Sequence, residues 1–371
     1  MTELIPVPAA DPMPLPGPLW LMLVLLLVTF LLHLIAMNLT VGGILIAVIC
    51  SLKRKRDGFS GLLVGDLVRI LPTTLAFTIT LGVAALLFVQ VLYGNLLYAS
   101  SILIGAFWIA VIPTLIVAYY GLYYCKSHAR STGLLWLVLF LLLAIGFVYV
   151  NNFTLMMEPS RWLAMYRHSA AGLNLNWSDG SLAPRYLHFM LGAFAIAGFA
   201  VFLVGVWQRA TEYGQWMQRQ GAQWFVVSTV LNYAVGMWFL IALPRSVLVD
   251  LFTGGPLAAM LIGLGMLLPL AAVAHVLLSI RTSKILLHAR LAVATTFLTL
   301  VVMVVLRQVV RGAYLAPFVR LHDLAVSPQW SVIVLFLLLF VAGLATVFVM
   351  LRKYWTAQGE QVPTREMSSA D

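Results

Sequence analysis

Three residues with metal-binding side chains recur at the same depth in separate apolar segments of the chain. His33, His188 and Met260 each lie 20 or 21 residues before the first lysine or arginine that follows them. In a helix with a rise of 1.5 Å per residue, this spacing equals ~30 Å, about the thickness of the hydrocarbon core of a bilayer. Because imidazole and thioether groups bind haem iron, His188 and Met260 on facing helices predict a haem-binding pair, with His33 as a further ligand.

Polar side chains of two other segments lie at this depth as well. Gln90 and Arg311 each follow an arginine at the inner start of their segment by 21 residues, and Gln308 lies one turn lower. Arg311 and two further outer-level arginines, Arg245 and Arg307, are expected to pair with haem propionates. Without a ligand, the same residues would be interfacial polar side chains, and depth alone leaves both interpretations open.

The composition shows which kind of structure must position these residues. Of the 371 residues, 63% are hydrophobic and 9% are charged, and the mean hydropathy is +1.02. Soluble domains carry roughly 25% charged residues. A soluble enzyme, a disordered chain and a nucleic-acid binder are therefore excluded, despite a pI of 9.8. We expect an all-α integral membrane protein, because helices satisfy their own backbone groups within a bilayer.

Nine apolar runs, bounded by charged or turn residues, are long enough to cross a bilayer as helices, which takes ~20 residues. The runs fall at about 19–50, 67–93, 101–125, 133–156, 184–208, 222–243, 257–280, 289–310 and 331–351. We expect a Pro-rich periplasmic arm at 1–18, a nine-helix membrane domain at 19–352 and a cytoplasmic tail at 353–371. Two links, 157–183 and 312–330, exceed a tight turn and are expected on the outer face.

The distribution of basic residues orients the spans. Fifteen lysines and arginines fall in or beside the links after the first, third, fifth and seventh spans and at the C-terminus, whereas six fall on the opposite side. Because lysine and arginine accumulate in cytoplasmic loops, this bias predicts a periplasmic N-terminus and a cytoplasmic C-terminus. The expected location is the cytoplasmic (inner) membrane of a bacterium, as a multi-pass protein.

Five stretches in order along the chain carry a family resemblance. In the first span, His33 is followed after five residues by Leu-Thr-x-Gly. The fifth span holds Tyr-Leu-His, and the seventh holds Met-Leu-Ile-Gly-Leu-Gly. The stretches are 33–42, 82–94, 152–159, 186–188 and 260–265. With the nine-span layout, they resemble subunit I of the cytochrome bd quinol oxidase superfamily. The resemblance implies a bd-oxidase subunit I-like bundle in which His33 ligates a high-spin haem, and His188 with a methionine ligates a low-spin haem b.

The chain departs from this family where the oxidases carry acids. Gln90 stands at the position of an acid in the family's second span, and Gln308 is the nearest match to a glutamate at the high-spin haem. Leu261, rather than Met260, aligns with the family's methionine, and the link at 244–256 is far shorter than the oxidases' quinol-receiving loop. Because no aspartate or glutamate lies in the middle of any predicted span, proton delivery for O2 reduction is poorly supported.

We therefore expect a membrane cytochrome b-like subunit of a respiratory redox complex, in contact with other membrane subunits. It would transfer electrons between the quinone pool and a periplasmic c-type cytochrome or other redox subunit, through haem b near the periplasmic face. One haem b is expected between His188 and Met260, and a second at His33 and a bound quinone stay open. Two alternatives remain. One is a terminal oxidase or nitric oxide reductase subunit of the same superfamily, and the other is a haem-free membrane anchor or quinone-binding subunit.

Overall fold

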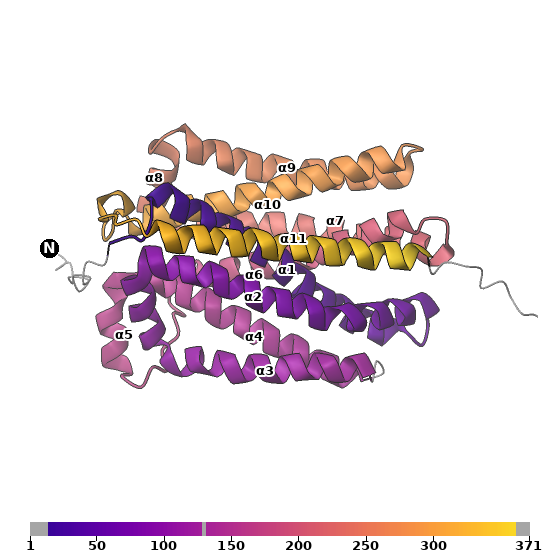
Figure 1. Cartoon of the computed structure of the whole chain (residues 1–371), viewed down its shortest axis with the longest axis horizontal. Helices are drawn as coiled ribbons and strands as arrows, with labels where there is room; N and C mark the ends of the chain where they lie inside the picture. Colours follow the sequence, from indigo (N-terminus) through magenta and orange to yellow (C-terminus); the bar gives the residue numbers. More distant parts are fainter. Residues whose placement is uncertain (1–13, 128–130, 361–371) are drawn as a thin grey trace, which may run out of the picture.

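The computed structural model describes residues 14–127 and 131–360. Residues 1–13 of the expected arm and 361–371 of the expected tail lie outside this part of the chain. The described chain is built of helices that run side by side along one long axis (Figure 1). The short links gather at the two ends of these rods, as they do in a protein that crosses a bilayer repeatedly.

Nine helices in the described part of the chain are long and apolar enough to cross a membrane. They are α1 (Leu19–Lys53), α2 (Gly58–Leu103), α3 (Gly105–Ser127), α4 (Thr132–Met156), α6 (Leu182–Trp207), α7 (Glu212–Ile241), α9 (Pro256–Arg281), α10 (Ile285–Leu315) and α11 (Trp330–Glu360). Four shorter elements lie in the links, namely η1 (Pro159–Arg161), α5 (Trp162–His168), α8 (Arg245–Thr253) and η2 (Leu321–Asp323). The described part of the chain is thus all-helical, and its nine long apolar helices agree with the nine runs predicted for a multi-pass membrane protein.

Helix α2 differs most from its predicted range of 67–93, because it is 46 residues long. It begins early because Asp57 caps it: the Asp57 carboxylate accepts a hydrogen bond from the Phe59 backbone N–H at 3.1 Å. At its outer end the helix bends at Tyr93 (φ −135°, ψ 26°) and then continues. The apolar run marks the part that lipid can surround, whereas capping and packing decide where the helix ends.

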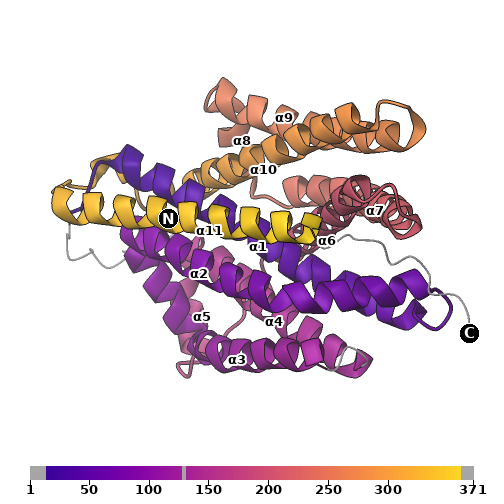
Figure 2. The ribbon, with the colours of Figure 1, turned by 45° about the vertical axis from the view of Figure 1, so that its right-hand side comes forward.

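The nine long helices form three groups. Figure 2 shows the α9–α10 hairpin on one side, α3 and α4 on the other, and α1 with α6 and α7 between them. Helix α1 contacts α2, α4, α6 and α10, so its side chains lie between the groups. Helix α11 runs along the outside of the bundle (Figure 1), and many of its apolar side chains are exposed, as a lipid-facing helix requires.

Glycines bring α6 and α7 into close contact. A Cβ at Gly198 of α6 would lie 2.8 Å from the Trp224 Cβ of α7. A Cβ at Gly205 or Gly221 would overlap the backbone of the facing helix. Small residues at such contacts let two membrane helices approach and gain van der Waals contact. The α6–α7 hairpin is therefore the close-packed scaffold on which His188 is mounted.

Candidate functional site

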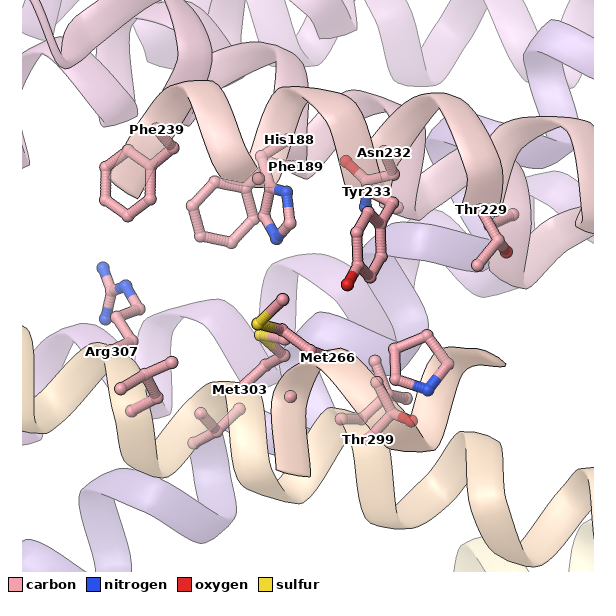
Figure 3. A pocket seen from close by; sticks show the side chains of 18 of the residues that line it. His188, Phe189, Thr229, Asn232, Tyr233, Phe239, Met266, Thr299, Met303 and Arg307 are labelled. Carbon is pink, nitrogen blue, oxygen red and sulfur yellow. The ribbon is translucent and has the colours of Figure 1, made fainter. Parts of the chain in front are cut away.

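Two large cavities between the helices, both partly open to the surface, are of interest. The first cavity, of 270 Å³, lies between the α6–α7 hairpin and the α9–α10 hairpin (Figure 3). The second cavity, of 1390 Å³, is lined mainly by α1, α2, α3, α4 and α6. Four residues line both cavities: Phe30, Arg185, Phe189 and Arg307. The two cavities are therefore neighbours with a shared wall.

His188 of α6 points across the first cavity toward Met266 of α9 and Met303 of α10 (Figure 3). The ring fits against α7 because Gly236 has no side chain: a Cβ there would lie 3.2 Å from His188 Cε1. Its Nδ1 is buried beside the main chain of Asn232 without a hydrogen bond of regular geometry. An imidazole and a thioether on opposite walls of one cavity are the side-chain types that hold haem iron.

Met260 lies outside this arrangement. Its side chain is 55% exposed, and it lines neither cavity. Six residues turn an α-helix by about 600°, so Met260 and Met266 point to different sides of α9. The spacing that places Met260 at the expected depth does not determine the side of the helix on which it lies. Met266 and Met303 are the thioethers that face His188.

Three guanidinium groups gather at the end of the cavities nearest the outer links. They belong to Arg185 of α6 and to Arg307 and Arg311 of α10. The Cζ atom of Arg185 lies 4.8 Å from the centre of the Phe239 ring, and that of Arg307 lies 4.3 Å from the centre of the Phe30 ring. Arg311 is only 3% exposed. Its Cζ atom lies 5.2 Å from the centre of the Tyr93 ring. Aromatic faces thus contact all three cations.

These three arginines lack acidic partners. None forms an ion pair with an aspartate or glutamate that the structure describes. The Nε of Arg185 is buried without a hydrogen-bond partner in the same part of the chain. Because a buried, unpaired ion costs several kcal/mol, an anionic group bound beside the cluster would stabilise it.

His33 of α1 faces the second cavity. Its Nδ1 lies 2.9 Å from the carbonyl oxygen of Thr78 on α2. If Nδ1–H donates to this carbonyl, the Nε2 lone pair is free, as in many metal-ligating histidines. Gly82, one turn further along α2, leaves room for the ring, because a Cβ there would lie 2.9 Å from the His33 Nδ1. The geometry around His33 suits a ligand that binds through Nε2.

The two predicted glutamines have different surroundings. The Gln308 Nε2 donates to the Tyr93 hydroxyl at 2.6 Å, and its Oε1 accepts from Arg311 Nη1 at 2.9 Å. Gln308 therefore ties an arginine of the cluster to the tyrosine at which α2 bends. Gln90 lines neither cavity. The structure thus gathers five of the predicted residues at or beside the cavities, namely His33, His188, Arg307, Gln308 and Arg311.

Sequence reasoning missed Met266 and Met303 as thioethers that face His188, and Arg185 as an anion-binding group. In the sequence, Arg185 stands at the outer start of an apolar run, where it has the pattern of an ordinary loop cation. A signal for Met303 exists: it lies one turn before Arg307, which falls inside the predicted span at 289–310 and is not assigned to either membrane face. No comparable signal distinguishes Met266 from the other methionines of the chain.

A hydrogen-bonded cover closes the outer end of the bundle. Arg161 Nη1 donates to Asn176 Oδ1 and Ser178 Oγ, both at 2.9 Å, and Arg161 Nε lies 3.3 Å from Glu158 Oε2. Burial raises the pKa of Glu158, and the hydrogen bond from Asn176 Nδ2 at 2.9 Å opposes this effect. The Asn176 backbone N–H donates to Asn151 Oδ1 of α4 at 3.1 Å, and Asn174 Nδ2 donates to the Leu103 carbonyl of α2 at 3.0 Å. The segment at 157–183 is therefore attached to the bundle.

The other described histidines lie away from the cavities. His275 and His288 face each other near the inner end of the α9–α10 hairpin, with 3.4 Å between their Nδ1 atoms. Neither ring lines a cavity. Within the part of the chain that the structure describes, no three His, Cys, Asp or Glu residues gather as a metal site would require. His33 and His188 are thus the imidazoles that the described helices present to the cavities.

Comparison with known proteins does not assign the chain to a family. A scan against protein-family models and a search of curated proteins both give no match. The resemblance to subunit I of the cytochrome bd superfamily stays an interpretation of short motifs. The geometry of the two cavities is therefore the main support for a function.

Proposed function

We propose that this chain is a membrane cytochrome b-like subunit of a respiratory redox complex. It carries electrons between the quinone pool and a redox partner at the periplasmic face, such as a c-type cytochrome. The observation that carries the proposal is the first cavity. His188 faces two methionines across it, and the buried Arg185 and Arg307 lie in its wall without acidic partners.

A haem b suits the first cavity group by group. His188 supplies an imidazole from α6, and Met303 or Met266 supplies a thioether from the opposite hairpin. Apolar side chains such as Phe189 and Leu240 line the walls. Arg185 and Arg307 neutralise propionates through charge-assisted hydrogen bonds. When bound, the haem supplies one-electron chemistry, while the protein orients it and tunes it through ligands and burial.

The second cavity supports a further haem at His33. Thr78 fixes the ring, and Arg307 and Arg311 also line this cavity, where they would pair with propionates. No aspartate or glutamate of the described residues lines either cavity. Reduction of O2 or NO consumes protons, so the lack of a lining carboxylate favours electron transfer over a terminal oxidase or nitric oxide reductase. A haem-free anchor is disfavoured because it would leave the buried arginines unpaired.

The spectrum of the purified protein tests the proposal. A reduced-minus-oxidised difference spectrum should show a haem b band, and a pyridine haemochrome assay should count one or two haems per chain. We expect His188→Ala to remove the low-spin haem. Met303→Leu or Met266→Leu should convert it to a high-spin form, whichever sulfur is the ligand.

Met260→Leu is the matched control, because Met260 lies on the same helix as Met266 and outside the cavity. Its spectrum should equal that of the unchanged protein. Preparations without any haem b would overturn the proposal. A spectrum that responds to Met260→Leu but to neither of the other two would restore the ligand pair predicted from depth.

A further inference from the structure

The first cavity extends beyond the space beside His188. Figure 3 shows Arg307 and Phe239 at one end, and Thr229 and Thr299 at the other. We call this second end the inner chamber. It is defined by Asn38 of α1, Thr229 and Tyr233 of α7, and Thr296 and Thr299 of α10. Thr296 precedes Met303 by seven residues, which places it ~10 Å further inward.

Polar atoms in the inner chamber lack partners. Asn38 is 3% exposed and its Oδ1 is unpaired, and Thr296 is 6% exposed and its Oγ1 is unpaired. The Tyr233 hydroxyl points into the cavity (Figure 3) and forms no hydrogen bond with any residue that the structure describes. Buried polar groups are normally hydrogen-bonded, so Asn38 and Thr296, together with a Tyr233 hydroxyl that faces the same cavity, indicate a ligand.

The surroundings limit the chemistry of this ligand. The two arginines that line the first cavity, Arg185 and Arg307, lie at its other end, and no described acidic residue lines it. The walls of the inner chamber include apolar side chains such as Phe225 and Ile196. The ligand is therefore neutral, largely apolar, and able to form a few hydrogen bonds. A quinone ring with two carbonyl oxygens has this chemistry.

The polar side chains of the inner chamber could form hydrogen bonds with both the quinone and the quinol form of such a ring. The hydroxyls of Tyr233 and Thr296 can donate to quinone carbonyls, and the Asn38 Oδ1 can accept from a quinol hydroxyl. Met237 of α7 lines the cavity and is 37% exposed. An isoprenoid tail could leave past this side chain into the bilayer.

We infer that the inner chamber, formed by Asn38, Tyr233 and Thr296, binds the head group of a membrane quinone on the inward side of the His188–Met303 pair. The inference rests on the proposed function only in that a haem fills the outer part of the same cavity. It places quinone within the bundle, rather than in the short outer link at 244–256.

Binding of decylubiquinone, a benzoquinone with a ten-carbon tail, to the purified full-length protein tests the inference. Isothermal titration should show saturable binding. Thr296→Val and Asn38→Leu should each weaken it about tenfold, the effect of losing one buried hydrogen bond. The control is Thr295→Val, the same change one residue away. The Thr295 hydroxyl already donates to the Leu291 carbonyl at 2.8 Å, and Thr295 lines neither cavity.

Haem content is measured on the same samples, so that loss of haem and loss of quinone binding are read separately. Haem b without saturable quinone binding would overturn this inference and leave the proposed function standing. Equal binding by Thr296→Val and Thr295→Val would also overturn it. Quinone binding by a protein without haem would support the inner chamber and overturn the proposed function.

Discussion

A single hydrogen bond decides which nitrogen of His33 is presented to the second cavity. The Thr78 carbonyl lies 2.9 Å from Nδ1, so the proton is expected there and Nε2 is left to bind. The carbonyl is in reach because α1 and α2 pack tightly at Gly82. The nitrogen that the His33 ring presents to the cavity thus depends on Gly82, which has no side chain to push the ring away.

Gly82→Ala should weaken haem binding at His33. The added Cβ would lie 2.9 Å from two atoms of the ring, so the ring must move away from Thr78. Overpacking of this kind costs about 1–3 kcal/mol, or roughly tenfold or more in affinity. Haem stoichiometry and the high-spin signal report the loss. Gly65→Ala, on the same helix and with no atom within 4 Å of its Cβ, should change neither; equal effects of both changes would contradict the argument.

Glu158 should make stability fall as the pH rises. Burial raises its pKa, so between the ordinary glutamate value and the raised value the folded protein holds a proton that the unfolded chain releases. The stabilisation is complete at pH values below the ordinary glutamate pKa, and it is lost as the pH rises through the raised pKa of Glu158. Thermal unfolding in detergent should show this decline, and Glu158→Gln should flatten it. Asp323→Asn, at an exposed carboxylate, serves as control, and an unchanged slope in Glu158→Gln would refute the assignment.

The residue-level predictions from sequence concern depth and leave the direction of each side chain open. His33 and His188, predicted from their distance to cytoplasmic basic residues, both face cavities. Met260 satisfies the same distance but is exposed, because a helix rotates by about 100° per residue and depth leaves this rotation free. The inner chamber could not be predicted from the sequence, because Asn38 and Thr296 differ from other polar residues only in their unpaired buried atoms, which the structure shows.

At the scale of elements, hydropathy predicts the number of spans better than their ends. All nine runs correspond to long helices. Yet α2 extends beyond the apolar run at both ends, because Asp57 caps it on one side and the bend at Tyr93 does not stop it on the other. Capping and tertiary contacts set helix ends, and neither is measured by a hydropathy window.

The α6–α7 hairpin should be the least tolerant element of the site. Gly221→Val would force atoms into the backbone of Phe202 and separate the two helices that position His188 and Gly236. We expect a large loss of monodisperse protein in size-exclusion chromatography and a cost above about 3 kcal/mol in what remains.

Gly263→Val on α9 provides the comparison for this change, since no atom lies within 4 Å of its Cβ. It should leave the yield and the melting temperature close to those of the unchanged protein. If both valines were tolerated equally, the close approach of α6 and α7 would not be a determinant of the fold.

At the scale of the whole molecule, α1 joins the two cavities. Phe30 lies in the wall of both, and Arg307 stacks on its ring. Ligands in the two cavities would therefore be neighbours at the outer end, while the inner chamber extends from the first cavity alone.

The orientation of the molecule in the membrane gives the last prediction. Basic residues predict that the link at 157–183 is periplasmic and that the loop after α9 is cytoplasmic. Both native cysteines, Cys50 and Cys125, are buried, so a new surface thiol can be labelled selectively. A membrane-impermeant maleimide should label Gly180→Cys in intact spheroplasts, and Ser283→Cys only after permeabilisation. The unchanged protein controls for native thiols. The opposite labelling would invert the topology and move the arginine cluster, with its proposed haem propionates, to the cytoplasmic face, where a periplasmic redox partner could not reach it.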